Sequence, residues 1–410
     1  MRPAGRCAGR LAPVTVLLIL AVAASAHAAE LSGTPPETHD VRSQYLESAL
    51  APLWQLEELA GRSEVSLASG REVLVTTERN PDYRYLLFVP ELDGEFPVYS
   101  AGTYIVRRRV SDGGLDQLKI FLRSDPGFFV RVWPAGEGGG ERATMSVFVA
   151  GVELHRSIPL PVSLEVLLAE PLERIFELTR GRVSWPLIYP SVRHGGYRDV
   201  ATMAARTRST LHTLPDAEDG AMDEHGRLVL IESLVLQDQQ GGFNCSGFAK
   251  WVVDGLYHSL YGEFLAIEPL KEKHLELRGH RWSEPREDER DPYFGLDWTR
   301  NLATALLSAE RGGAEIHPEE ADVRRVPYHS YVEDMGYPVR RLSQILYLLA
   351  VTEPGHFYIA SLNREFGADP PLNQHVHVAV LFPYLDEKGR FFVDVMERNV
   401  ETTLESLSRR

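Results

Sequence analysis

Cys245 stands in a sequence context that favours nucleophilic chemistry. It lies within residues 241–248, GGFNCSGF, at the start of a stretch over 248–261 whose apolar spacing predicts an amphipathic helix. Asn244 and Ser246 are both residue types that cap helix N-termini. In the first turn of a helix, unpaired backbone N–H groups stabilise a thiolate and lower the pKa of the thiol. The N–H group of Cys245 is a candidate oxyanion donor, and the preceding glycines would let backbone amides approach a substrate carbonyl.

The cysteine content supports the same interpretation. The chain contains two cysteines, and Cys7 lies in a segment that has the pattern of a cleavable leader. The mature protein would then hold a single thiol, so Cys245 could not form a disulfide within the chain. An unpaired cysteine in an exported protein is either a reactive thiol or a small buried core residue. The glycines, the cap and the helix favour the nucleophile.

A cysteine nucleophile needs a partner that protonates the leaving group, and histidine is the usual one near neutral pH. Among 14 histidines, His375 and His377 alternate with valines on a predicted strand over 375–382. Alternation on a strand predicts that both imidazoles face the same side. We expect His377 to be the base in preference to His375.

An acid that orients the base is expected on the following strand. Asp394 lies in the predicted strand 390–396, which a hairpin can bring opposite His377. A carboxylate there would hold the imidazole in its useful tautomer, completing a Cys-His-Asp triad. Glu397 and Asn399 are close in sequence and compete for this assignment.

The motifs resemble those of a known family. The pentapeptide NCSGF at 244–248 is similar to the Asp-Cys-Ser-Gly-Phe signature of NlpC-type cell-wall endopeptidases, and HVAV at 377–380 resembles their His-Val-Gly-Ile strand. The resemblance implies a papain-like fold, Cys245 as nucleophile, His377 as base, and cleavage of peptide bonds in peptidoglycan stem peptides. The sequence departs from the family at Asn244, where aspartate is usual, and in the longer interval between cysteine and histidine.

Two further assignments depend on related resemblances. Gln239 precedes Cys245 by the spacing at which papain-like proteases place an oxyanion glutamine, and Gln240 is an adjacent alternative. NlpC-type enzymes usually have His, Asn or Gln as third polar residue. An acid such as Asp394 is more similar to transglutaminase-like thiol proteases, which share the Cys, His, Asp order.

No cofactor or metal is implied. His375 and His377, two residues apart, could be metal ligands, but no cysteine or further histidine follows close in sequence.

The elements that position these residues predict an α+β protein of two domains. A helix over 41–59, bent at Pro52, leads into β-rich runs that suggest a small sandwich or barrel. These runs are 72–77, 85–89, 103–110, 117–122, 128–133 and 144–149. The proline-containing segment 157–161 predicts a linker. We therefore expect a helix plus β-rich accessory domain over 40–160 and a papain-like catalytic domain over 165–410.

The second half carries the pattern expected of a catalytic domain. A helix over 162–179, interrupted at Pro171, could belong to either half. Later elements are predicted helices at 299–309 and 339–352 and strands at 356–362, 375–382 and 390–396. The polar segments 215–226 and 282–297 are predicted to be surface loops.

The N-terminus predicts export. Three arginines, an apolar run over 11–24 and the small-residue pattern at 26–28 predict a signal peptide over 1–28 and a periplasmic or secreted protein. The apolar run is too short for a permanent membrane span, and no later stretch is long enough. The formal net charge of −15 opposes binding to nucleic acid.

These observations predict an exported cysteine peptidase or amidase that acts on a peptidoglycan peptide or a protein substrate. Two alternatives stay open. The chain could be a catalytically silent module that binds cell wall or protein, or its activity could be that of a transglutaminase-like thiol protease.

Overall fold

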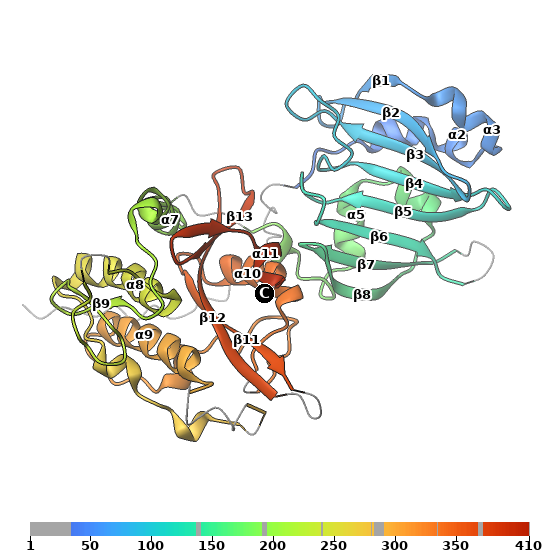
Figure 1. Ribbon diagram of the computed structural model, residues 1–410. Coiled ribbons are helices and arrows are strands. Elements are labelled where there is room, and N and C mark those ends of the chain that lie inside the picture. The colour runs from blue at the N-terminus through green and yellow to red at the C-terminus, as the bar shows by residue number, and fades with distance from the viewer. Residues whose placement is uncertain are drawn as a thin grey trace, which may run out of the picture.

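The computed structural model describes residues 34–136, 141–190, 195–238, 241–279, 281–282, 291–333, 335–367 and 372–409 (Figure 1). The predicted signal peptide over 1–28 lies outside these residues. The described chain contains both helices and strands, so the α+β class is confirmed. Its two larger sheets lie in two bodies, one before and one after residues 191–194.

The first body is built on one eight-stranded antiparallel sheet whose strands follow the order of the sequence. All six predicted strands form, and a further strand extends the sheet at each edge. The strands are β1 (Arg62–Val65), β2 (Glu72–Arg79), β3 (Tyr83–Pro90), β4 (Tyr104–Arg109), β5 (Leu115–Phe121), β6 (Phe129–Pro134), β7 (Ala143–Val149) and β8 (Val152–Leu160).

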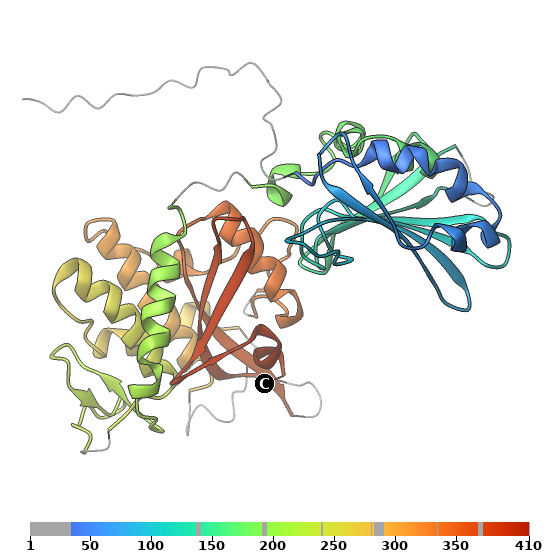
Figure 2. The ribbon, with the colours of Figure 1, turned by 90° about the horizontal axis from the view of Figure 1, so that it is seen from above.

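Helices, and not a second sheet, cover this sheet, so the expected sandwich or barrel is wrong. They lie on one face (Figures 1 and 2), where every second residue of the strands is apolar and buried. The predicted breaks at Pro52 and Pro171 are present. The covering elements are α1 (His39–Gln44), α2 (Leu46–Leu50), α3 (Leu53–Leu56), η1 (Glu57–Leu59), α4 (Leu164–Ala169) and α5 (Leu172–Leu178).

The segment predicted to be a linker is instead the end of β8. Pro159 fits there because β8 is an edge strand, where a missing N–H group leaves no neighbour unpaired. Leu164, Leu167 and Leu168 of α4 are buried in the same core as the sheet. The first body therefore continues past residue 160, through α5 and α6 (Trp185–Ile188).

The second body contains a four-stranded antiparallel sheet in the order β11-β12-β13-β14. Its strands are β11 (Tyr358–Phe366), β12 (Leu372–Leu385), β13 (Phe391–Glu397) and β14 (Val400–Thr402). A small hairpin of β9 (Ala221–Met222) and β10 (Leu228–Val229) forms in the predicted loop 215–226 and just after it. The short helices are η2 (Leu211–Thr213), η3 (Glu268–Lys271), η4 (Leu275–Leu277), η6 (Pro318–Ala321), η7 (Val339–Arg341) and α11 (Leu404–Ser408).

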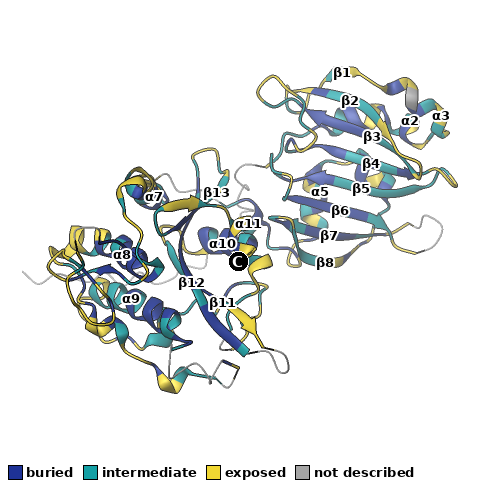
Figure 3. Cartoon of the chain, in the orientation of Figure 1, coloured by how far each residue is buried: buried dark blue, intermediate teal, exposed yellow. Residues whose placement is uncertain are grey.

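β12 is an inner strand of the second body's sheet, and most of it is buried (Figure 3). Three helices pack on one side of its sheet: α7 (Arg198–Thr210), α8 (Cys245–Tyr261) and α9 (Phe294–Glu310). α10 (Leu342–Thr352) packs on the other. Val378 and Val380 belong to the core beneath α8 and α9, whereas Ala379 and Leu381 belong to the core beneath α10. A strand buried on both faces is held firmly in position.

α10 also joins the two bodies. Its Tyr347 accepts a hydrogen bond from Arg123 of the first body at 2.9 Å and donates to the carbonyl of Leu187 at 2.8 Å. The Gln344 side chain donates to the carbonyls of Val149 and Val152. Buried residues of both bodies, such as Phe128 and Tyr347, also belong to one hydrophobic cluster, so the two bodies share a continuous core.

No helix within the described ranges is long and apolar enough to span a membrane.

Candidate functional site

Cys245 is the first residue of α8, so it lies in the first turn of a helix as expected, and the cap is Asn244 and not Ser246. Asn244 caps the helix, and its side-chain oxygen accepts a hydrogen bond from the backbone N–H of Gly247 at 2.8 Å. The N–H groups of Cys245 and Ser246 have no hydrogen-bond partner among the described residues. Both N–H groups belong to the positive end of the helix and can donate to an oxyanion.

The glycines around Cys245 allow a neighbouring backbone segment to pack closely against the start of α8. The segment 215–221 packs against the start of α8. Its Asp216 forms a parallel β-bridge with Phe243, which precedes the helix. A Cβ atom on Gly247 would lie 1.8 Å from the carbonyl oxygen of Gly220, and one on Gly242 would lie 2.5 Å from that of Pro215. Only glycine permits these approaches.

Gln237 is a positioning residue that the sequence analysis missed. Its amide nitrogen donates to the carbonyls of Val229 (2.7 Å) and Gly242 (3.1 Å), and its amide oxygen accepts from the N–H of Gly242 at 2.7 Å. These bonds fix the segment that leads into α8. The predicted oxyanion residues Gln239 and Gln240 lie outside the described residues.

A β-bulge shapes the strand that carries the two histidines. His377 pairs with Leu362 and His375 pairs with Asn363, so Val376 has no partner on β11. Bulges re-aim side chains next to functional sites. The simple alternation expected for His375 and His377 therefore does not hold at this point of β12, yet both imidazoles act on the thiol of Cys245 and lower its pKa.

The acid beside His377 is Glu397 and not Asp394. The Nε2 atom of His377 lies 2.7 Å from a carboxylate oxygen of Glu397, and the two side chains are 8% and 2% exposed. Asp394 instead pairs with Arg208 at 2.9 Å and accepts a hydrogen bond from Tyr384. The register explains this, because Asp394 lies opposite Phe382.

His375 is held by different groups. Its Nδ1 atom lies 3.0 Å from the hydroxyl oxygen of Ser361 on β11. Its ring packs against Gly295 in the first turn of α9, where a Cβ atom would come within 1.9 Å of the imidazole. Trp298 of the same helix donates to the carbonyl of Ser246 at 2.9 Å. α9 therefore contacts both His375 and the start of α8 and fixes their relative positions.

The environment of Cys245 favours the thiolate. Burial raises the pKa of the thiol, but hydrogen bonds with His375 and His377, the positive charge of His377 and the N–H of Val378 outweigh it and lower the pKa to about 5. The residue is nevertheless partly exposed. A thiol with such a pKa is a thiolate at neutral pH, and here it lies beside groups that can donate a proton.

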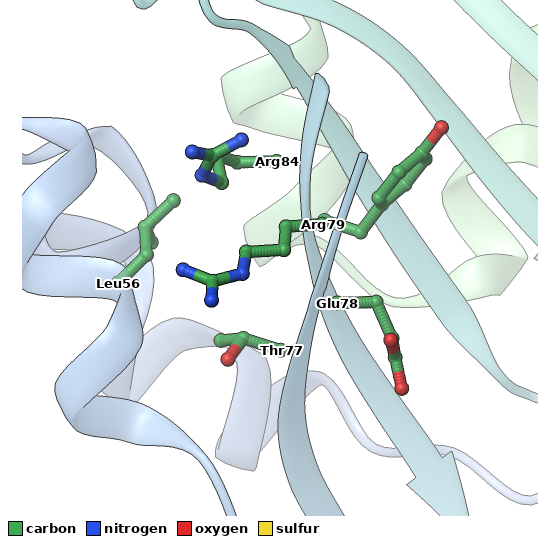
Figure 4. A pocket seen from close by; sticks show the side chains of 6 residues that line it. Leu56, Thr77, Glu78, Arg79 and Arg84 are labelled. Carbon is green, nitrogen blue, oxygen red and sulfur yellow. The ribbon is translucent and has the colours of Figure 1, made fainter. Parts of the chain in front are cut away.

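Neither a metal site nor the cavity beside the first sheet offers an alternative to the Cys245 site in the described part of the chain. No group of three or more His, Cys, Asp or Glu residues there could hold a metal ion. A cavity of about 320 Å³ lies beside the β2–β3 hairpin of the first body. Figure 4 shows Arg79 and Leu56 pointing toward one another across it, whereas Glu78 points away. Its lining includes none of the predicted site residues.

Comparison with known proteins gives one family match. Residues 33–187 match the family described as "Domain of unknown function (DUF8515)". No curated protein and no solved structure matches the chain. The matched range coincides closely with the first body and ends before Cys245, so the candidate site lies outside it.

Proposed function

We propose that the protein is an exported cysteine peptidase or amidase with Cys245 as nucleophile and His377 as general acid and base. The observation that carries the proposal is the partly exposed Cys245 at the start of α8, where two neighbouring imidazoles outweigh burial and lower the pKa of the thiol to about 5. A helix N-terminus, a strand histidine and a buried acid are the parts that a cysteine hydrolase needs.

The reaction follows from these contacts. The thiolate of Cys245 attacks a substrate carbonyl carbon, and the oxyanion that forms accepts from the N–H groups of Cys245 and Ser246. As the C–N bond breaks, imidazolium His377 gives its proton to the departing amine. Neutral His377 then takes a proton from water, which hydrolyses the thioester and releases the acid. Glu397 orients the ring of His377 throughout.

His375 suits a supporting role. Ser361 engages its Nδ1 atom, so a proton on Nε2 would make it a neutral donor toward the thiolate or the oxyanion. His377 is the better base because the buried carboxylate of Glu397 lies beside its ring and can orient it.

The substrate class rests on resemblance. The motif at 244–248 favours peptide bonds of peptidoglycan stem peptides, a papain-like catalytic fold and a periplasmic or extracellular location. An acid as third residue favours a second candidate, a transglutaminase-like thiol protease that acts on protein. The two candidates share every step of the reaction.

The proposal is tested by alkylating the native protein with iodoacetamide across pH and by incubating it with purified muropeptides and with a protein substrate in parallel. Cys245→Ala is the control in both assays. Cleavage of either substrate by the wild type alone supports the proposal and separates the two candidates. A thiol that reacts only near the ordinary cysteine pKa, together with no cleavage, would indicate a silent binding module.

A further inference from the structure

The sheet of the first body has a face that no helix among the described residues covers (Figures 1 and 2). Residues Leu118, Ile120, Val130 and Val132 belong to the helix-covered core. The residues that alternate with them point to the opposite face. On the three strands β5, β6 and β7 these are Lys119, Phe121, Phe129, Arg131, Ser146 and Phe148.

Strand register arranges the aromatic residues in a row. Phe121 pairs with Phe129, and Phe129 pairs with Phe148. The rings of Phe121 and Phe129 meet edge to face at 5.9 Å, and those of Phe129 and Phe148 stack at 4.5 Å. Three strands are thereby joined by one continuous aromatic ladder.

Two cations lie against this ladder. The ammonium of Lys119 is 4.2 Å from the ring centre of Phe121 and 4.0 Å from that of Phe129. The guanidinium of Arg131 is 5.2 Å from Phe129 and 5.1 Å from Phe148. Lys119 and Arg131 are direct partners across the strands and stay partly exposed, whereas Phe121 and Phe129 are buried.

Neither cation has an acidic partner. Among the described residues the side chains of Lys119 and Arg131 form no ion pair and no hydrogen bond, and the Nε atom of Arg131 is buried without a partner. By contrast, Arg107 on neighbouring β4 pairs with Asp116 at 2.5 Å, and Arg109 pairs with Asp112 at 2.9 Å.

This arrangement is electrostatically costly. Burial and the charge of Arg131 lower the pKa of Lys119 to about 8. Lys119 is also the only lysine before Lys250 in a chain with a net charge of −15. Two unpaired like charges over apolar rings are stabilised by an anion that touches both.

We propose that Lys119 and Arg131 form a binding site for an oxyanion, a carboxylate or a phosphate group, on the uncovered face of the eight-stranded sheet. The planar guanidinium can bind two oxygens of the anion, and the ammonium adds a second charge. The aromatic ladder excludes water from one side, which strengthens the interaction. The site lies in the body that matches the family of unknown function, and it does not depend on the hydrolase proposal.

The test uses the full chain and follows the side-chain NMR signal of Lys119 during pH titrations at low ionic strength, without anion and with inorganic phosphate or succinate. The signal is assigned by its loss in Lys119→Met. A bound anion favours charged lysine, so the pKa of Lys119 should rise in its presence. A rise with phosphate alone assigns a phosphate ligand, a rise with succinate alone assigns a carboxylate, and a rise with both supports the shared site.

Matched variants localise the effect. Arg131→Gln should weaken anion binding about 10-fold through loss of a charge-assisted hydrogen bond. Lys119→Arg keeps the charge and should keep binding, which is measured by calorimetry. Arg156→Gln removes an exposed, ion-paired arginine from the same sheet and should leave binding unchanged. An unchanged Lys119 signal with both anions, or equal loss of binding in Arg131→Gln and Arg156→Gln, overturns the proposal.

Discussion

The imidazole of His377 lies 2.7 Å from the carboxylate of Glu397, and both side chains are almost fully excluded from solvent. This pair replaces the expected pairing with Asp394, which lies opposite Phe382 and is bound by Arg208. Glu397 is therefore the acid to test.

Substitution of the two acids should separate their roles. Glu397→Gln keeps the size of the side chain but removes the charge that stabilises imidazolium, so we expect hydrolysis to slow by roughly 100-fold. Asp394→Asn removes a carboxylate of the same strand that does not touch His377, and the rate should stay within about threefold. Steady-state kinetics measure both, and thermal unfolding checks that each variant is folded. Equal rates in the two variants would contradict the assignment.

The reactivity of Cys245 should depend on pH through its lowered pKa. Burial opposes ionisation, but the two histidines outweigh it, so alkylation by iodoacetamide should reach half of its maximal rate near pH 5. His377→Gln removes the positive charge and should move this midpoint upward. Each unit of movement corresponds to about 1.4 kcal/mol of lost stabilisation of the thiolate. A midpoint that stays in place would exclude His377 as the partner of the thiolate.

Gly295 should tolerate no side chain. In Gly295→Ala the new methyl group would come within 1.9 Å of the His375 ring, so the ring or α9 must move. We expect a loss of about 1–3 kcal/mol in the free energy of unfolding, together with slower alkylation of Cys245.

Gly255→Ala is the matched control for that substitution. It lies in α8, and its Cβ atom would meet nothing within 4 Å. It should stabilise the protein by up to about 1 kcal/mol through helix propensity. Urea unfolding compares the two variants, and similar behaviour would show that Gly295 does not constrain His375.

The cap at Asn244 should affect both stability and reactivity. Asn244→Ala removes the acceptor for the N–H of Gly247, at a cost of about 1 kcal/mol. Asn244→Asp keeps the cap but places a negative charge beside the thiolate, which should raise the pKa of Cys245. Urea unfolding should therefore show that the alanine variant is less stable than the wild type. The pH profile of alkylation should show that the aspartate variant has a higher thiol pKa. If the pH profile of alkylation of Asn244→Asp is the same as that of the wild type, the charge at position 244 does not act on the thiol of Cys245.

Gln237 should be needed for the geometry that precedes α8. Gln237→Met keeps the length of the side chain but removes all of its hydrogen bonds to Val229 and Gly242. Leaving these backbone groups unpaired should cost about 1–3 kcal/mol and slow the alkylation of Cys245. Full stability and reactivity in this variant would show that the segment is held by other contacts.

Local features of the molecule follow from the sequence alone. Cys245 lies in the first turn of α8, one of the two predicted caps is used, and six strands form where β-rich runs between turn residues predict them. Each of these features depends on residues within one or two turns of a helix or along one strand. The short-range physics of capping and periodicity is therefore sufficient to predict them.

The tertiary structure decided which distant groups meet. β8 is an edge strand and tolerates Pro159, so a segment that looked like a linker extends the sheet. The β12–β13 register places Asp394 opposite Phe382, and Glu397 contacts His377 in its place, while the bulge at Val376 sets the β11 partners of the two histidines. A shift of one residue changes every cross-strand partner while the pattern of each strand stays almost the same. Register depends on packing against α8, α9 and α10, which no single stretch of sequence contains.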